Sequence, residues 1–448
     1  MVRKVSIFFF FLISVIDVLA QLKVGVSKKI ITPQFPFYLS GYAVRVEPAT
    51  QKFHDLWAKA LVIESSPLNK TVIVTTDVLG LTPQIHEEVV NGLARKFNFQ
   101  KSQIILNSSH THSGPIIWPS LEMIGDFDST TIKKFTAYNN FLIQSIIEIV
   151  GDAVQNKFPA KIYSGHGKTG FAMNRRQLVN GKIINGKNPG GNTDHDVPVL
   201  KVLNAKAEVK AVLFGYACHN TTVTSGNYLI NGDYAGFAQI ELEKAYLGAT
   251  ALFFTGCAGD QNPQPRGTIE LAEQHGKTLA GAVVSVLNKK MAPVGGTIKS
   301  QLQEATLHFI PFDVNKYNAE LTSGNPYMQR RARLMLQAYN RGWDITKYDY
   351  PVQVMRIGNA LTFVSLAGEV VVDYALKIKK MYPKENLFIA GYCNHVMGYI
   401  PTKKILEEGG YEAEDNLVYY GKPGPFEKDA EARIFTTLKR IMAGLGVK

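Results

Sequence analysis

The fold class is set by residues 71–115, TVIVTTDVLGLTPQIHEEVVNGLARKFNFQKSQIILNSSHTHSGP. Two runs of apolar and β-branched residues, 71–81 and 103–109, have the length of strands. The segment between them, 85–97, has apolar residues at helical spacing. The stretch therefore predicts a strand–helix–strand unit, which is typical of α/β proteins, and its second strand runs into two histidines.

The same alternation continues along the chain. Helical spacing predicts further helices over 135–158 and 233–248. Further strand-like runs are 22–33, 59–65, 161–171, 197–204, 211–220, 251–260, 305–312, 350–369 and 386–392. The glycine-rich stretch 180–194 predicts a surface loop or hairpin rather than a domain boundary. We therefore predict a single large α/β domain, with a layered mixed β-sheet flanked by helices.

The N-terminus has the pattern of a secretory signal peptide. Two basic residues precede an apolar run over 5–19, and the segment ends in the small residue Ala20. The run is short for a transmembrane helix and is interrupted by Asp17. We therefore predict a signal peptide over 1–20 that is cut after Ala20, no transmembrane span, and a secreted or periplasmic mature domain over 21–448.

Composition limits the kinds of partner. The formal net charge is +12, but the basic residues are scattered in short clusters without interleaved aromatic residues. This pattern does not favour nucleic acid, and it leaves a weak preference for anionic substrates or for peripheral contact with a membrane. The oligomeric state is not predicted. An odd number of cysteines without zinc-like spacing predicts buried free thiols at Cys218, Cys257 and Cys393.

Side chains that can bind a metal or act in catalysis follow four of the predicted strands. They are His110 with His112, His219, Asp260 with Gln261 and Asn262, and Glu369. In α/β folds, ligand sites lie beyond the carboxyl ends of strands. Residues i and i+2 of an extended segment point to the same side, so His110 and His112 are expected to face one site. One of them could bind a metal while the other acts as acid or base.

Each of these residues also has a structural interpretation. A pair of histidines one residue apart is often incidental, and a single histidine such as His219 is commonly a hydrogen-bonded core residue. Glu369 lies between apolar runs, where burying an unpaired charge costs several kcal/mol. Its carboxylate must therefore be paired or coordinate a cation. The residues alone therefore predict an α/β hydrolase-like enzyme with a metal site.

A series of motifs adds a family resemblance. The motifs are SSHTHSGP (108–115), MNRR (173–176), ACHNTT (217–222), GDYAGFA (232–238), GCAGDQNP (256–263), LAGE (366–369) and GYIPTKKILEEGGYE (398–412). In this order they resemble the neutral/alkaline, non-lysosomal ceramidase family over essentially the whole mature chain. The resemblance implies a single catalytic domain that is a zinc amidase, in which zinc-activated water attacks the amide carbonyl.

The resemblance also implies roles for particular residues. The zinc ligands would be His110, His219, Glu369 and Tyr399, and Tyr399 would also belong to the catalytic group. His112 falls where the family has a second histidine suited to proton transfer or to holding the tetrahedral intermediate. Arg175 matches a family arginine near the site, which would either anchor a polar or anionic substrate group or form a surface salt bridge.

Two features depart from the family pattern. Asn262 stands where the long ceramidases carry a serine, and an asparagine cannot be a nucleophile, although its amide can donate to an oxyanion. The chain also ends soon after the helical pattern over 427–445, where family members continue into an immunoglobulin-like domain thought to help at lipid surfaces. This difference weakens the expectation that ceramide is the substrate.

Three functions are compatible with these sequence features. A secreted zinc amidase acting on N-acyl sphingoid lipids needs an apolar slot, which the residues Ile116, Ile117, Trp118 and Met123 would line if they are not core. The same zinc site acting on a polar substrate, such as a glycan-linked amide, ester or glycoside, needs an open polar or basic cleft. A non-catalytic binding protein with a degenerate site is the third, and the retained ligand set argues against it.

Overall fold

Three larger β-sheets form the body of the computed structural model, which describes residues 22–447. The predicted signal peptide over 1–20 lies outside the described residues. In spatial order, the first sheet contains β4 (Ile104–Ser108), β3 (Lys70–Thr76), β2 (Trp57–Glu64), β1 (Lys23–Ile30) and β5 (Phe158–Pro159). The second contains β11 (Thr250–Thr255), β10 (Val209–Tyr216), β9 (Asp196–Leu203), β6 (Lys161–Lys168) and β13 (Ala292–Val294). The third contains β14 (Ile298–His308), β15 (Lys347–Ile357), β16 (Leu361–Leu366) and β18 (Leu387–Ala390).

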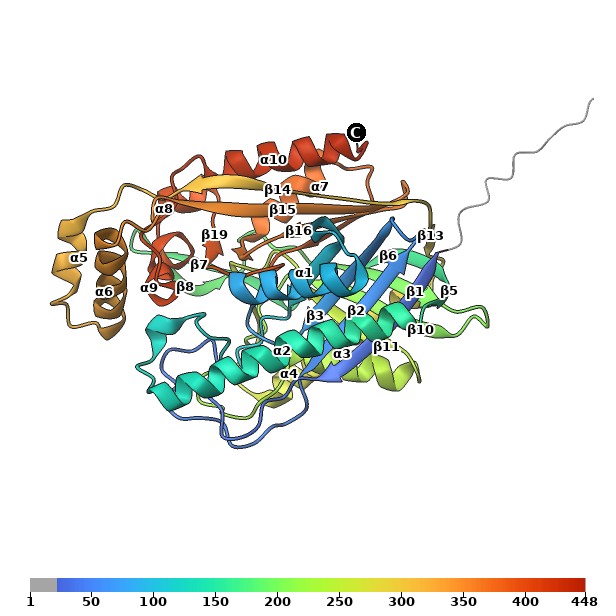
Figure 1. The fold of residues 1–448 in the computed structure, drawn as a ribbon, viewed down its shortest axis with the longest axis horizontal. Coiled ribbons are helices and arrows are strands. Elements are labelled where there is room, and N and C mark those ends of the chain that lie inside the picture. The colour runs from blue at the N-terminus through green and yellow to red at the C-terminus, as the bar shows by residue number, and fades with distance from the viewer. Residues whose placement is uncertain (1–21, 448) are drawn as a thin grey trace, which may run out of the picture.

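Two small sheets and the helices complete the described chain (Figure 1). The small sheets are β12 (Gln261–Pro263), β7 (Ala172–Val179) and β8 (Lys182–Asn188), and the pair β17 (Glu369–Val370) and β19 (Tyr399–Ile400). The helices are α1 (Pro83–Phe97), α2 (Ser129–Gln155), α3 (Asp233–Ala245), α4 (Ile269–Leu287), α5 (Val314–Glu320), α6 (Pro326–Asn340), α7 (Val372–Met381), α8 (Lys403–Glu408), α9 (Leu417–Tyr420) and α10 (Ala430–Gly444). Short turns of other helix types are η1 (Lys101–Gln103), η2 (Glu122–Ile124) and η3 (Tyr411–Asp415).

Each larger sheet contains one parallel pair of strands joined through a helix. The pairs are β3 and β4 through α1, β10 and β11 through α3, and β16 and β18 through α7. The other pairings within these sheets are antiparallel. A parallel pair needs a long crossover, which a helix provides. The strand–helix–strand patterns predicted over 71–109 and 211–260 correspond to the first two units, whereas α7 of the third unit was not predicted.

The three larger sheets share one central apolar core. Ile73 of β3, Leu213 of β10 and Phe363 of β16 all belong to this core, whereas the next residue along each strand packs under the outer helices. The outer layers are α1 and α2 on the first sheet, α3 and α4 on the second, and α7 and α10 on the third. Strands buried on both faces read as continuous apolar runs, which explains the sequence pattern.

The carboxyl ends of the three parallel pairs meet at Asn107. Its Nδ2 donates to the carbonyl oxygen of Gly391 beyond β18 at 2.8 Å, and its Oδ1 accepts from the backbone N–H of Thr255 in β11 at 2.9 Å. One buried side chain therefore joins the ends of strands from three different sheets, because its amide satisfies backbone groups that no sheet pairs. The segments that follow β4, β10 and β16 are consequently brought to one place.

The predicted fold class, a layered mixed β-sheet flanked by helices in a single domain, is confirmed. The stretch 180–194 forms a hairpin, in which β8 pairs with β7. The three cysteines are free and buried, as predicted. Helix α2 begins six residues before the predicted start, because the Asp128 side chain caps it by accepting from the N–H of Thr131. Within the described range, no helix combines the length and apolarity needed to cross a membrane.

Candidate active site

The loop after β4 holds His110 and His112, but not in the predicted geometry. The expectation of an extended segment is wrong, because His110 has a left-handed backbone with φ of 62°. After β4 the chain follows the segment 76–78, and the N–H of His110 donates to the carbonyl of Val78 at 3.0 Å. The two rings nevertheless converge, with their Nε2 atoms 3.2 Å apart. Strain in a non-glycine residue at this point is typical of functional loops.

Backbone carbonyls fix the tautomers of His110 and His219. The Nδ1–H of His110 donates to the carbonyl of Leu79 at 2.6 Å, and that of His219 donates to the carbonyl of Ala258 at 2.7 Å. Burial, with the positive charge of Arg175, lowers the pKa of His219 to about 4, so this ring is neutral. Each Nε2 therefore presents a lone pair to the site, the arrangement that metal-binding histidines adopt.

Glu369 and Tyr399 bring two oxygen atoms to the same point. Oε2 of Glu369 lies 3.2 Å from Nε2 of His110 and 3.0 Å from Nε2 of His219. Glu369 opens β17 and pairs with Tyr399 of β19, whose hydroxyl lies 3.2 Å from Nε2 of His219. The hydroxyl of Tyr420 donates to the other carboxylate oxygen of Glu369 at 2.5 Å. Lone pairs and a carboxylate this close repel one another unless a cation lies between them.

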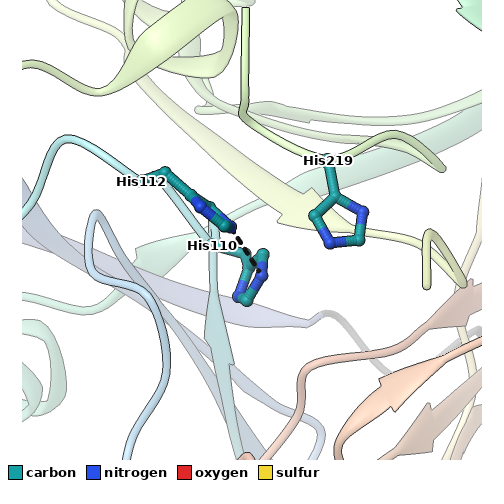
Figure 2. Close-up of side chains that lie close together, drawn as sticks. All are labelled: His110, His112 and His219. Carbon is teal, nitrogen blue, oxygen red and sulfur yellow. Dashed lines mark hydrogen bonds between the residues drawn. The ribbon is translucent and has the colours of Figure 1, made fainter. Parts of the chain in front are cut away.

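Three histidines form a buried group that could hold a metal. The ligand atoms of His110, His112 and His219 lie within 4.8 Å of one another (Figure 2). Nδ1 of His112 is buried without a hydrogen-bond partner among the described residues, unlike Nδ1 of the other two rings. Ligating histidines normally donate through the second nitrogen, so His112 fits better as a neighbour of the ion than as a ligand.

Arg175 connects Tyr399 of the predicted site with Glu412. Its Nη2 donates to the hydroxyl of Tyr399 at 3.0 Å, and its Nε pairs with Oε1 of Glu412 at 2.7 Å. Burial alone lowers the pKa of Arg175, but Tyr399 and Glu412 raise it well above its usual value, so the guanidinium is charged. The alternative of a surface salt bridge is wrong, because both partners of this ion pair are buried.

Asn262 points its amide group toward the site. It lies in β12, opposite Met173 of β7. Its Oδ1 accepts from the hydroxyl of Thr221 at 3.3 Å and from Nη1 of Arg175 at 3.5 Å. Because a guanidinium can only donate, the amide oxygen faces Arg175, which leaves the NH₂ group for the cavity that Asn262 lines.

A cavity of about 280 Å³ opens onto this group of residues. The polar residues that line it include His112, Arg175, Asn262 and Arg266, and the aliphatic and aromatic ones include Leu121, Ile124, Tyr411, Tyr419 and Tyr420. The residues suggested for an apolar slot lie elsewhere. Ile116, Ile117 and Trp118 pack in the core of the first sheet, and buried Met123 does not line the cavity.

Several residues of this site were missed by sequence reasoning. Glu412 and Tyr420 contact Arg175 and Glu369, yet nothing in their local pattern distinguishes them from other acidic or aromatic residues. Arg45 is buried and donates to the carbonyls of His112 and, at 2.9 Å, of Asn227, so it holds the loop that carries His112. A basic residue between two valines gave no signal of this role.

Comparison with known proteins identifies the family of this chain. The fold and site together define an α/β protein with a buried group of histidines, able to hold a metal, at the ends of its parallel strands. The family described as neutral/alkaline non-lysosomal ceramidase, N-terminal, matches residues 22–275. The chain therefore belongs to the neutral/alkaline non-lysosomal ceramidase family.

Individual relatives agree with this assignment. The neutral ceramidase of Pseudomonas aeruginosa is 26% identical over 242 residues, which are 50% of this chain and 34% of the relative. Neutral ceramidase B of Dictyostelium discoideum is 26% identical over 248 residues, which are 51% of this chain and 33% of the relative. The matched region thus spans about one third of the length of these curated relatives. The crystal structure of the Pseudomonas aeruginosa enzyme has the same fold, with a TM-score of 0.73 at 18% identity over 95% of this chain and 74% of that one.

Proposed function

We propose that this protein is a secreted zinc-dependent hydrolase that cleaves the N-acyl amide bond of ceramide-like lipids. The observation that carries the proposal is the convergence of His110, His219, Glu369 and Tyr399 on one point beside a cavity. The names of the relatives support an amide substrate, because they are neutral ceramidases. Export is part of the proposal, and N-terminal sequencing of the exported protein should begin at Gln21.

The donor set fits zinc. Ligand atoms about 2.0 Å from a tetrahedral zinc ion lie about 3.3 Å from one another. The contacts of Glu369 with both histidines and of Tyr399 with His219 are between 3.0 and 3.2 Å. Two neutral imidazoles, a carboxylate and a phenol are a hard-to-intermediate donor set that suits this ion. Zinc bound there would supply a Lewis acid that activates water as a nucleophile at neutral pH.

His112 is suited to proton transfer in this proposal. Burial, together with neighbouring His110 and His219, lowers its pKa well below the usual value, which favours the neutral ring. Its Nε2 lies 3.2 Å from that of His110, which places it next to the ligands and on the wall of the cavity. A proton taken from water could then pass to the leaving nitrogen from the same ring.

The amide of Asn262 is suited to stabilise an oxyanion, and its replacement tests this role. For Asn262→Ala we expect kcat/KM to fall about 100-fold with zinc content unchanged, because one preorganised donor is lost. Asn262→Ser keeps a donor and should lose about tenfold or less. Steady-state kinetics with metal analysis of each variant give the comparison. An alanine variant within threefold of the parent protein would contradict the role.

A direct assay tests the proposed function. The protein is stripped with a chelator, reloaded with zinc, and incubated with an N-acylsphingosine and with a panel of glycan-linked and amino-acid amides and esters, with products read by mass spectrometry. We expect release of fatty acid from an N-acyl amide by the zinc-loaded protein, at least about 100-fold faster than by the stripped protein. Equal turnover before and after stripping, or no cleavage of any N-acyl amide, would contradict the proposal.

The cavity also favours a second candidate, the same reaction on a more polar amide. Arg175 and Arg266 both line it, alongside Asn262 and Thr221. A purely apolar ligand would leave most N–H donors of Arg266 without partners, which is unfavourable in a partly enclosed site, whereas Arg175 is already paired with Glu412 and Tyr399. The panel in the assay separates the two candidates, because turnover of polar amides without cleavage of N-acylsphingosine would favour the second.

A further inference from the structure

Arg266 is a cation on the cavity wall that the proposed reaction does not use. It lies between β12 and α4, is partly buried, and lines the same cavity as His112 and Glu369. Arg175, the other arginine of the wall, is already occupied by Glu412 and Tyr399. The two arginines therefore differ in how many of their N–H donors remain available to a ligand.

The backbone around Arg266 is held firmly. The N–H of Gly267 donates to the carbonyl of Thr222 at 2.8 Å, and Nε2 of His275 contacts the carbonyl of Pro265 at 2.7 Å. The flanking residues thus tie this loop to the segment after His219 and to α4. A guanidinium on an anchored loop loses less conformational freedom on binding, which favours a recognition role.

Arg266 has no acidic partner in the described chain. Across residues 22–447, no carboxylate lies within 4.0 Å of its guanidinium, and its hydrogen bond goes to the hydroxyl of Tyr42 at a long 3.4 Å. Asp233 is the acidic residue whose charge, like that of Arg266, acts on Tyr42. That carboxylate is buried and accepts from the backbone N–H groups of Val223 and Tyr234. Most of the five N–H donors of Arg266 are therefore available.

The position of Tyr42 places Arg266 near His112. The ring of Tyr42 packs against that of His112, with centroids 4.9 Å apart, so Arg266 lies on the His112 side of the site. Tyr420, which donates to Glu369, is one of the aliphatic and aromatic residues that line the same cavity. The cavity thus combines an available cation near His112 with aliphatic and aromatic lining residues such as Leu121 and Ile124.

We propose that Arg266, assisted by the hydroxyl of Tyr42, binds an acidic group of the substrate. The preferred substrates are then N-acyl amides whose amine part carries a carboxylate or a sulfonate, with the acyl chain against the aliphatic and aromatic residues that line the cavity. A planar guanidinium binds such oxyanions through paired hydrogen bonds, which makes it the appropriate group for this recognition. The net charge of +12 attracts such substrates over longer distances. This inference rests on the proposed amidase function.

Matched substrates test the inference. N-dodecanoylglycine, N-dodecanoyltaurine and N-dodecanoylethanolamine share one acyl chain and differ in the charge of the amine part. For the zinc-loaded protein we expect kcat/KM for the acidic substrates to exceed that for the neutral one by about 10- to 100-fold. In Arg266→Gln this ratio should fall to within about threefold of one. A ratio near one in the parent protein, or a ratio that Arg266→Gln leaves intact, would overturn the inference.

A control variant and a binding measurement separate failure of this inference from failure of the proposed function. Arg341→Gln removes the same charge at an exposed position outside the cavity and should keep the selectivity of the parent protein. If no amide is cleaved, calorimetry of N-dodecanoylglycine against N-dodecanoylethanolamine still reports on Arg266. We expect tighter binding of the acid by about tenfold or more, in metal-free and zinc-loaded protein alike, and its loss in Arg266→Gln. Equal binding of the two ligands would reject the subsite, whatever the activity.

Discussion

The Glu369→Gln variant should lose bound zinc and at least about 1,000-fold in kcat/KM. The carboxylate lies 3.0 Å from Nε2 of His219 and 3.2 Å from Nε2 of His110, so in the proposed site it supplies the negative charge that the neutral imidazoles lack. A glutamine amide has nearly the same shape but no charge, and its N–H would compete with the metal for the histidine lone pairs. Metal analysis and amidase kinetics on the same preparation measure both effects.

Stability distinguishes a ligand from a structural residue at position 369. Without metal, the variant should unfold no more easily than the metal-free parent protein, because a glutamine N–H can donate to Nε2 of His219 and relieve the repulsion. Zinc should raise the melting temperature of the parent protein and not that of the variant. Glu304→Gln, on an exposed position of β14, is the matched control and should behave as the parent. A Glu369→Gln variant that keeps zinc and activity within tenfold would exclude the proposed ligand.

The Arg175→Met variant should lose about 3 kcal/mol of unfolding free energy together with most of its activity. The substitution removes one of the two arginines that pair with buried Glu412, so this carboxylate keeps only its contacts with Arg176. It also removes the donor to Tyr399, which positions that hydroxyl beside His219. Chemical denaturation gives the first effect and steady-state kinetics the second.

A double variant separates these two roles. In Arg175→Met, Arg176 faces two carboxylates, those of Glu408 and Glu412. Adding Glu412→Gln removes the excess negative charge while Arg176 keeps its ion pair with Glu408, and should recover most of the lost stability, because a neutral amide is less costly to bury than a carboxylate. Activity should stay low, since Tyr399 still lacks its donor. Recovery of activity along with stability would mean that Arg175 acts only through folding. A loss below about 1 kcal/mol in the single variant would contradict the importance of the buried pair.

The local units of the fold were predictable, because they depend on neighbouring residues. The run 71–81, the helix 85–97 and the run 103–109 correspond to β3, α1 and β4, which form a parallel pair with its crossover. The arrangement of three sheets around one core was not predictable in the same way. It depends on which distant strands pair and on side chains such as Asn107, whose hydrogen bonds cross between sheets.

The candidate site was predicted by residue type and by family resemblance more than by geometry. His110 and His112 do lie together, but through a left-handed turn rather than an extended strand. Glu412, buried and paired with Arg175, has the same local character in the sequence as many exposed acidic residues. Arg266 likewise became a candidate only once the absence of an acidic neighbour in the described chain was known.

By itself, the sequence determined the class of fold, its first strand–helix–strand units and a short set of candidate metal-binding and catalytic residues. These follow from periodicity, residue type and motif order, which are local properties of the chain. Only the tertiary structure decided that the segments after β4, β10 and β16 end at one point, and which charges there are already paired. Those properties are set by contacts between residues far apart in sequence, through the packing of three sheets on a shared core and the burial of Arg175 with Glu412.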